Sequence, residues 1–124
     1  MNVVDSSGWV EYFAAGPAAD FYAHAIEATD ELIVPTITIY EVYKTIARRR
    51  GENDALTAIM EMHQGHVVEL TAPLAVSAAT LSLDRQLPMA DAIILATARK
   101  YGATLWTQDA HFDGLDGVMS APRL

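Results

Sequence analysis

Residues 88–112 contain a helical pattern, a glycine and a short apolar strand in direct succession, with an acidic residue near each end of this unit. Pro88 suits the first helical position because its φ is fixed near the helical value, and Gly102 suits the left-handed residue that follows a helix. Asp91 is then predicted in the first turn of the helix and Asp109 just after the strand. In an open parallel sheet, helix amino ends and strand carboxyl ends meet at the edge where ligands bind. The unit therefore predicts two neighbouring carboxylates at that edge.

The remainder of the chain alternates short apolar segments with helical patterns. This alternation predicts a parallel sheet covered by helices on both faces, an α/β fold whose strand order stays open. A length of 124 residues suits a single domain spanning 1–124. We expect strands at 2–5, 32–34, 67–70, 103–106 and, as a last edge strand, 117–120, and helices at 8–14, 18–28, 36–50, 52–63 and 72–83.

The composition is that of a folded protein, with 52% hydrophobic residues and a mean hydropathy of +0.16. The sequence contains no run of about 20 apolar residues, so no membrane span is predicted. The first residues do not follow a secretion-signal pattern. The absence of cysteine excludes disulfides and thiolate metal sites, and a cytoplasmic location is expected. The net charge of −8 disfavours non-specific nucleic-acid binding by the chain as a whole, but it permits a local basic stripe or metal-masked carboxylates.

Four acidic residues are predicted at the same edge of the sheet, namely Asp5, Glu41, Asp91 and Asp109. At about 4 Å and an effective dielectric constant of about 20, each pair of carboxylates would repel by roughly 4 kcal/mol. Such a cluster is tolerable with a bound cation, with shifted pKa values or with wider separation. Hard oxygen ligands without cysteine favour Mg²⁺ or Mn²⁺ over zinc.

Three of these acids also have purely structural explanations. Asp5 could end a strand and cap the next helix, for which Ser6 and Ser7 also offer hydroxyl groups. Asp91 could be a first-turn acid favoured by the helix dipole, and Asp109 could be an ordinary turn residue. The predicted convergence on one edge favours a shared site over four separate explanations.

Glu41 lies further inside its helix than the other acids. If the helix begins at Thr38, Thr38 and Glu41 fit a capping box; if it begins at Thr36, Glu41 lies one turn inside and needs another explanation. Lys44 and Arg48 share a face with Glu41 because they lie three and seven residues after it. They are candidates for contact with the phosphates of a nucleic acid or with an acidic partner, or they are solvated cations that the helix dipole favours.

The order and spacing of four motifs resemble one protein family over nearly the whole chain. The motifs are Val4-Asp5-Ser6-Ser7, Ile39-Tyr40-Glu41-Val42, Met89-Ala90-Asp91-Ala92, and Thr107-Gln108-Asp109 with Phe112. The set resembles the PIN-domain ribonucleases, and among them the VapC toxins of bacterial toxin–antitoxin pairs. This resemblance implies a three-layer α/β/α sandwich around a parallel sheet, RNA cleavage with Mg²⁺ or Mn²⁺, homodimerisation, and inhibition by a cognate antitoxin.

The resemblance also implies roles for individual residues. By position, the metal-binding acids would be Asp5, Glu41, Asp91 and Asp109. Among them we expect three to be ligands, directly or through water, namely Asp5, Asp91 and Asp109, and Glu41 to help orient the water. The supporting residues that it implies are Ser6, Thr107 and, as a further acid, Asp113.

Two other functions remain open from the sequence. A phosphoacceptor receiver domain is also a small acidic α/β unit, but it expects paired acids after the first strand and a lysine after the last one. A non-catalytic α/β interaction module would keep the acids for structural reasons. We interpret the histidines as surface or packing residues and four aromatic residues as core or dimer-interface positions; these are His24, His63, His66 and His111, and Trp9, Phe13, Tyr40 and Tyr43.

Overall fold

A five-stranded parallel sheet forms the centre of the computed structural model, which describes residues 1–122. The strand order is β3-β2-β1-β4-β5, and every neighbouring pair is parallel. Asn2 in the central strand lies opposite Leu32 on one side and Thr104 on the other. The strands are β1 (Asn2–Val4), β2 (Leu32–Pro35), β3 (His66–Val68), β4 (Thr104–Thr107) and β5 (Val118–Ser120). The predicted parallel α/β sheet is confirmed.

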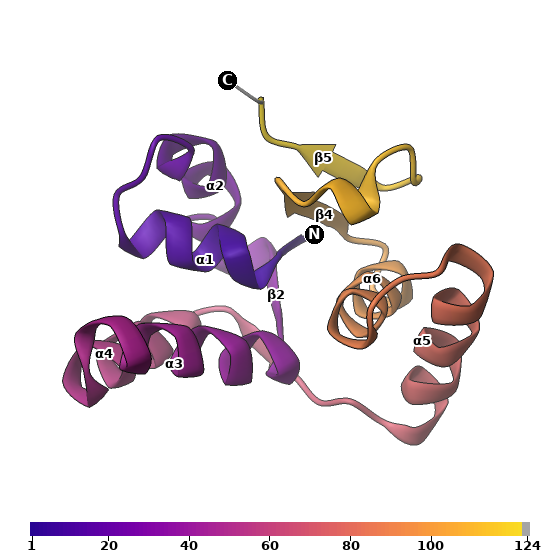
Figure 1. Cartoon of the computed structure of the whole chain (residues 1–124), viewed down its shortest axis with the longest axis horizontal. Helices are drawn as coiled ribbons and strands as arrows, with labels where there is room; N and C mark the ends of the chain where they lie inside the picture. The colour runs from indigo at the N-terminus through magenta and orange to yellow at the C-terminus, as the bar shows by residue number, and fades with distance from the viewer. Residues whose placement is uncertain (123–124) are drawn as a thin grey trace.

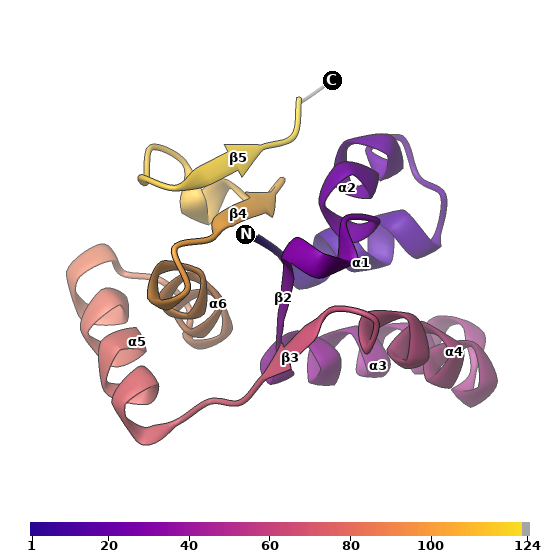
Figure 2. The same ribbon diagram turned by 180° about the vertical axis from the view of Figure 1, so that it is seen from behind.

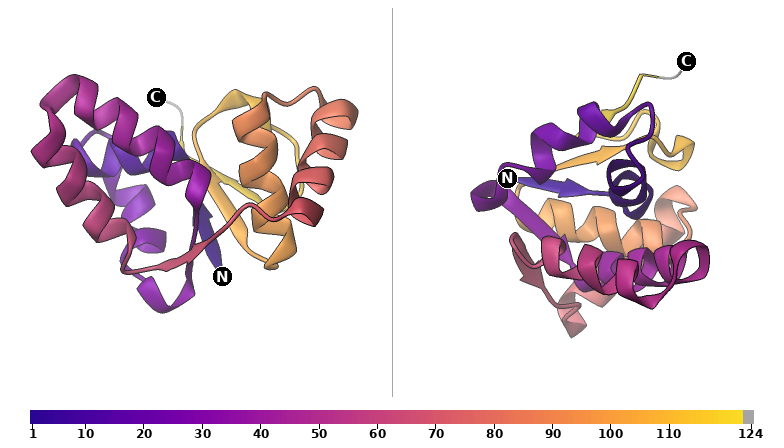
Figure 3. Two further views of the ribbon diagram at one scale, coloured as in Figure 1. Left: turned by 90° about the horizontal axis from the view of Figure 1, so that it is seen from below. Right: turned by 90° about the vertical axis from the view of Figure 1, so that its left-hand side faces the viewer.

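Helices cover both faces of this sheet, as Figures 1 and 2 show from opposite sides and Figure 3 shows from below and from the left. Within residues 1–122, no helix has both the length and the apolar character that crossing a membrane would require. The α-helices are α1 (Ser6–Phe13), α2 (Ala19–Ile26), α3 (Thr36–Arg50), α4 (Glu52–Met62), α5 (Ala72–Arg85) and α6 (Met89–Lys100), and two short 3₁₀ helices are η1 (Thr29–Glu31) and η2 (Ala110–Phe112).

The alternation of side chains along the strands separates two hydrophobic cores. Val3 and Ile33 face the core beneath α5 and α6, whereas Val4 and Val34 face the core beneath α1 to α4. Because α6 lies between the sheet and α5, its residues 92–98 are all buried. The three-layer α/β/α sandwich that the family resemblance implied is therefore confirmed.

Several helix ends differ from the sequence expectation by one or two residues, and two of them concern residues discussed above. Pro88 stands before the helix as its N-cap, so α6 begins at Met89 and not at the proline. The Asp5 side chain caps α1 by accepting a hydrogen bond from the Ser6 backbone N–H, so Ser6 is the first helical residue and not the cap. Gly102, by contrast, takes the expected left-handed conformation, with φ of 61°.

Gly8 lets α1 pack directly on α2. A Cβ atom at this position would lie closer than 3.0 Å to three ring atoms of Tyr22, a side chain with no exposed surface. We expect Gly8→Ala to lower the free energy of unfolding by about 1–3 kcal/mol, because overpacking in a buried contact forces the backbone to move. Urea denaturation measures this change. A stabilised variant, which is the usual result of Gly→Ala within a helix, would contradict the close packing.

Candidate functional site

Asp5 lies at the point where the order of the strands reverses. Chain order runs from β1 outward to β2 and β3 on one side, and β4 and β5 lie on the other side. The crevice at the carboxyl ends of the strands beside such a reversal is where open α/β sheets bind ligands. The Asp5 backbone N–H donates a 3.0 Å hydrogen bond to the Trp106 carbonyl, which extends the pairing of β1 with β4 and fixes Asp5 in this crevice.

Three donors hold the Asp5 carboxylate in one orientation. Oδ1 accepts a hydrogen bond from the Ser6 backbone N–H at 2.7 Å. Oδ2 accepts hydrogen bonds from Thr107 Oγ1 at 2.8 Å and from Ser7 Oγ at 3.2 Å. The side chain is almost completely buried, with 4% of its residue surface exposed. A buried carboxylate with fixed oxygens can serve as a rigid ligand.

Asp91 and Asp109 come together from α6 and the end of β4 around one histidine. Asp91 lies in the first turn of α6, and the Asp109 backbone N–H donates to Thr107 Oγ1 at 2.9 Å. His111 Nδ1 lies 2.9 Å from Asp91 Oδ2 and 3.1 Å from Asp109 Oδ1. Asp91, Asp109 and His111 each offer one ligand atom, and these atoms all lie within 4.8 Å of one another.

The charges of the site raise the pKa values of its own groups. Burial raises the pKa of Asp5 to about 6, and the negative charges of Asp91 and Asp109 add to this effect. Burial also raises the pKa of Asp91, as do the charges of Asp109 and Glu41, while His111 opposes the shift. The two carboxylates beside His111 raise its pKa in turn, with Asp109 contributing most. These carboxylates therefore repel one another when no cation is bound, and a cation among them would remove that repulsion.

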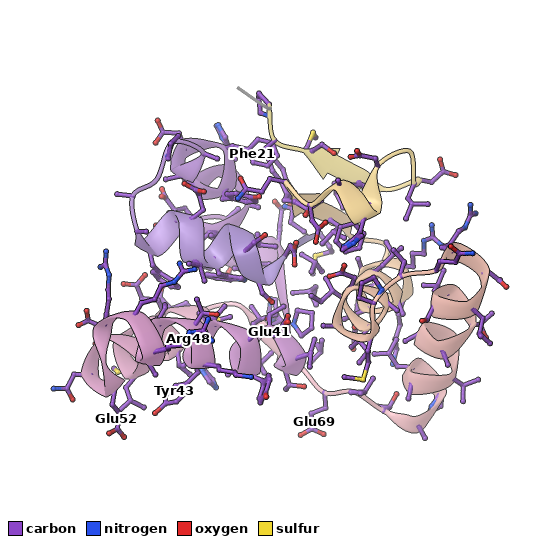
Figure 4. All side chains as sticks on the ribbon, in the orientation of Figure 1. Phe21, Glu41, Tyr43, Arg48, Glu52 and Glu69 are labelled. Carbon is purple, nitrogen blue, oxygen red and sulfur yellow. The ribbon has the colours of Figure 1, made fainter. Side chains whose placement is uncertain are left out.

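Glu41 faces the same site from α3. Because α3 begins at Thr36, Glu41 lies one turn inside the helix, and the capping-box interpretation is wrong. Thr38, the supposed cap, is buried and donates its hydroxyl hydrogen bond to the Pro35 carbonyl instead. Glu41 Oε1 accepts a 2.6 Å hydrogen bond from Ser6 Oγ, which ties α3 to the start of α1. Figure 4 shows Glu41 near the centre of the view, whereas Tyr43 on the same helix points to the lower edge.

The oxygen-rich donor set fits a hard divalent cation. Asp91 and Asp109 offer carboxylate oxygens close to each other beside His111, the charges of both raise the pKa of Asp5, and the charge of Glu41 raises that of Asp91. Asp5 also caps α1, as its structural explanation expected, and Asp109 caps the short helix η2; both roles are compatible with a place in the site. Mg²⁺ and Mn²⁺ prefer such carboxylate oxygens.

A polar groove of about 430 Å³ lies between α1 and α3, and among the four acids only Glu41 lines it. Lys44 does not line it, because its Nζ lies 5.7 Å from the Tyr40 ring centroid, on the side of α3 where an apolar depression is shared with α4. Arg48 is exposed on α3, and Asp113 follows η2, where its backbone N–H donates to the Ala110 carbonyl. The groove is lined by Ser6, Ser7, Val10, Glu11, Ala14, Glu41, Thr45, Arg49 and Gln108.

Three residues of this region were not assigned to the site from the sequence. His111 is exposed, as expected, but it also contacts two of the acids. The sequence signal for this contact was the position of His111 two residues after Asp109, since one tight turn brings the two side chains to the same side of the chain. Ser7 supports Asp5, and Arg49 in place of Lys44 enters the groove. The position of Arg49 depends on helix packing, which the local sequence does not specify, whereas the contact of Ser7 with Asp5 is local and spans two residues.

The chain belongs to the PIN domain family, whose family model matches residues 3–118. The match includes β2, β3 and β4 in full, parts of β1 and β5, and all four acids. A comparison with curated protein sequences gives no match.

Solved structures share the fold at low sequence identity. A toxin–antitoxin complex from Klebsiella pneumoniae superposes with a TM-score of 0.85, at 22% identity over 100% of both chains. Mycobacterium tuberculosis VapC20, described as a toxin that cleaves the sarcin–ricin loop, gives 0.81 at 21% identity over 98% of this chain and 100% of that one. VapBC2 from Rickettsia felis, solved with a promoter DNA fragment, gives 0.77 at 10% identity over 98% of both chains.

Proposed function

We propose that this protein is a metal-dependent endoribonuclease and the toxin of a VapBC-type toxin–antitoxin pair. The observation that carries the proposal is the convergence of Asp5, Asp91 and Asp109 on one crevice, with Glu41 beside them. Membership of the PIN domain family supports the same activity.

Each acidic residue has a proposed part in phosphodiester hydrolysis. A bound Mg²⁺ or Mn²⁺ would supply an activated water and would offset the charge that grows on the phosphate oxygens. Asp5, Asp91 and Asp109 would hold the cation, and Thr107, Ser6 and Ser7 keep Asp5 oriented. Glu41, itself fixed by Ser6, orients the attacking water, and Asp113 is a further supporting acid. Hydrolysis in this arrangement leaves 5′-phosphate and 3′-hydroxyl ends.

A cognate antitoxin is the proposed protein partner. Two of the similar structures are described as a toxin–antitoxin complex and as VapBC2, and this chain matches both along almost its whole length. Homodimerisation and a cytoplasmic location are further predictions from the family resemblance and the composition.

The sheet argues against a phosphoacceptor receiver domain. Receiver domains of the CheY type have the strand order 2-1-3-4-5, whereas the order here is β3-β2-β1-β4-β5. A single acid, Asp5, follows β1, and no lysine follows Lys100 in the sequence.

Cleavage of structured RNA tests the proposal. We expect purified protein to cut RNA with Mg²⁺ or Mn²⁺ and not with EDTA, and a sarcin–ricin loop hairpin is a suitable first substrate. Asp91→Asn should lower the rate by about a hundredfold or more, since loss of residues that merely support metal ligands already costs 10–100-fold. Asp84→Asn, an equal charge change on the exposed face of α5, is the matched control. Equal rates for the two variants would contradict the site.

A further inference from the structure

The basic residues of this acidic chain are concentrated on one helix. Four of its eight lysines and arginines lie at positions 44–50, in the second half of α3. These four side chains point in different directions, and they differ in whether they line the groove between α1 and α3. Of the four, only Arg49 lines the groove.

Glu41, Thr45 and Arg49 form a row along α3 because they are spaced four residues apart. All three line the groove, so this row leads from Glu41, whose charge acts on Asp91, to a guanidinium group. Arg49 is exposed and forms no salt bridge with any residue in 1–122. Glu11, the other acid in the groove, accepts a 3.3 Å hydrogen bond from the Gln108 amide. The free guanidinium is therefore available to an anionic ligand that enters from the acids.

We propose that Arg49 and Thr45 form a phosphate-binding subsite for the RNA strand, remote from the cleaved bond. The inference rests on the proposed ribonuclease function and adds the path of the substrate. A planar guanidinium binds two phosphate oxygens at once, and the Thr45 hydroxyl provides a further donor. An RNA backbone fits because the groove is polar and contains Glu41, the residue proposed to orient the attacking water.

The distance between Glu41 and Arg49 along α3 sets the position of the bound phosphate relative to the cleaved bond. Eight residues separate Glu41 from Arg49, which is about 12 Å along the helix axis. At about 3.4 Å per stacked nucleotide, the Arg49 phosphate lies two to four nucleotides from the cleaved bond. The subsite therefore predicts a minimum length of RNA on one side of the cut.

The neighbouring arginine provides a matched control. Arg50 lines an apolar cleft of about 380 Å³ between α1, α3 and α4 that Arg49 also borders, but Arg50 is absent from the groove. We expect Arg49→Gln to raise KM for RNA about tenfold with little change in kcat, and Arg50→Gln and Lys44→Gln to leave both nearly unchanged. RNA binding should also be measured in EDTA at several salt concentrations. The slope of log K against log salt concentration should be smaller in magnitude by about 0.7 in Arg49→Gln than in the wild type, which is the value for one single-strand phosphate contact.

Truncated RNAs provide the decisive comparison. On one side of the cut, the RNA strand reaches Arg49. When fewer than two nucleotides remain on that side, KM of the wild-type protein should rise and should equal KM of Arg49→Gln. Equal RNA affinity of Arg49→Gln and Arg50→Gln, or an Arg49→Gln defect that is the same for every RNA length, would overturn the subsite. Arg49-dependent RNA binding in a protein that never cleaves RNA would retain the subsite and overturn the ribonuclease proposal.

Discussion

We expect Asp5→Asn to reduce RNA cleavage by at least about a hundredfold and, in EDTA, to raise the melting temperature of the protein by several degrees. Cleavage falls because the proposed cation loses a charged ligand that is fixed by three hydrogen bonds. Stability rises because burial makes an ionised carboxylate unfavourable at this position. Asparagine keeps the size of the side chain and caps a helix as well as aspartate does.

The pH dependence of stability gives the size of this effect. The pKa of Asp5 is about 6 in the folded protein and 3.8 in an unfolded chain, so the folded state binds the Asp5 proton more tightly. The free energy of unfolding therefore falls as pH rises from about 4 to 6, by at most about 3 kcal/mol from this group. Asparagine should recover about 1–2 kcal/mol above pH 6, and not the full amount, because the Thr107 and Ser7 hydroxyls both donate to Oδ2 and would have to accept from an amide NH₂ in its place.

Thermal unfolding in EDTA between pH 4 and pH 8, combined with RNA cleavage at pH 7 to 8, measures both effects. The difference in stability between wild type and Asp5→Asn should grow with pH up to about 6 and then stay constant. Asp84→Asn should show neither effect, since this acid is exposed on α5. An Asp5→Asn variant that is both less stable and fully active would contradict the assignment of Asp5 to a metal site.

The elements of the fold follow from local sequence, whereas the strand order does not. Residues 36–50 were predicted as a helix and form α3 with the same bounds, because the apolar spacing, the basic last turn and Gly51 all agree. Gly102 was correctly assigned to the end of a helix. The order β3-β2-β1-β4-β5 depends on how helices pack on the two faces of the sheet. The prediction of one domain over 1–124 stays a prediction.

The position of the site was predictable because parallel α/β folds bring strand carboxyl ends to one edge. Asp5, Asp91 and Asp109 could be placed there from their own segments alone. The Ser6–Glu41 hydrogen bond joins residues 35 positions apart, and Thr107 reaches Asp5 across 102 positions. Such contacts depend on tertiary packing, so the supports of the site came from the structure, although the family resemblance had implied that Ser6 and Thr107 belong to it.

Magnesium itself should stabilise the folded protein, independently of any substrate. A cation that binds only the folded state adds about 2.7 kcal/mol at a hundred times its dissociation constant, which is about 10 °C in melting temperature for a chain of this size. The measurement is thermal unfolding with increasing MgCl₂ against NaCl of equal ionic strength, because screening alone also relieves repulsion in a chain of net charge −8. Asp109→Asn should lose most of the magnesium shift, since its carboxylate lies with Asp91 at the same centre, while Asp84→Asn should keep it. Equal shifts with MgCl₂ and NaCl in the wild type would contradict a metal site among these carboxylates.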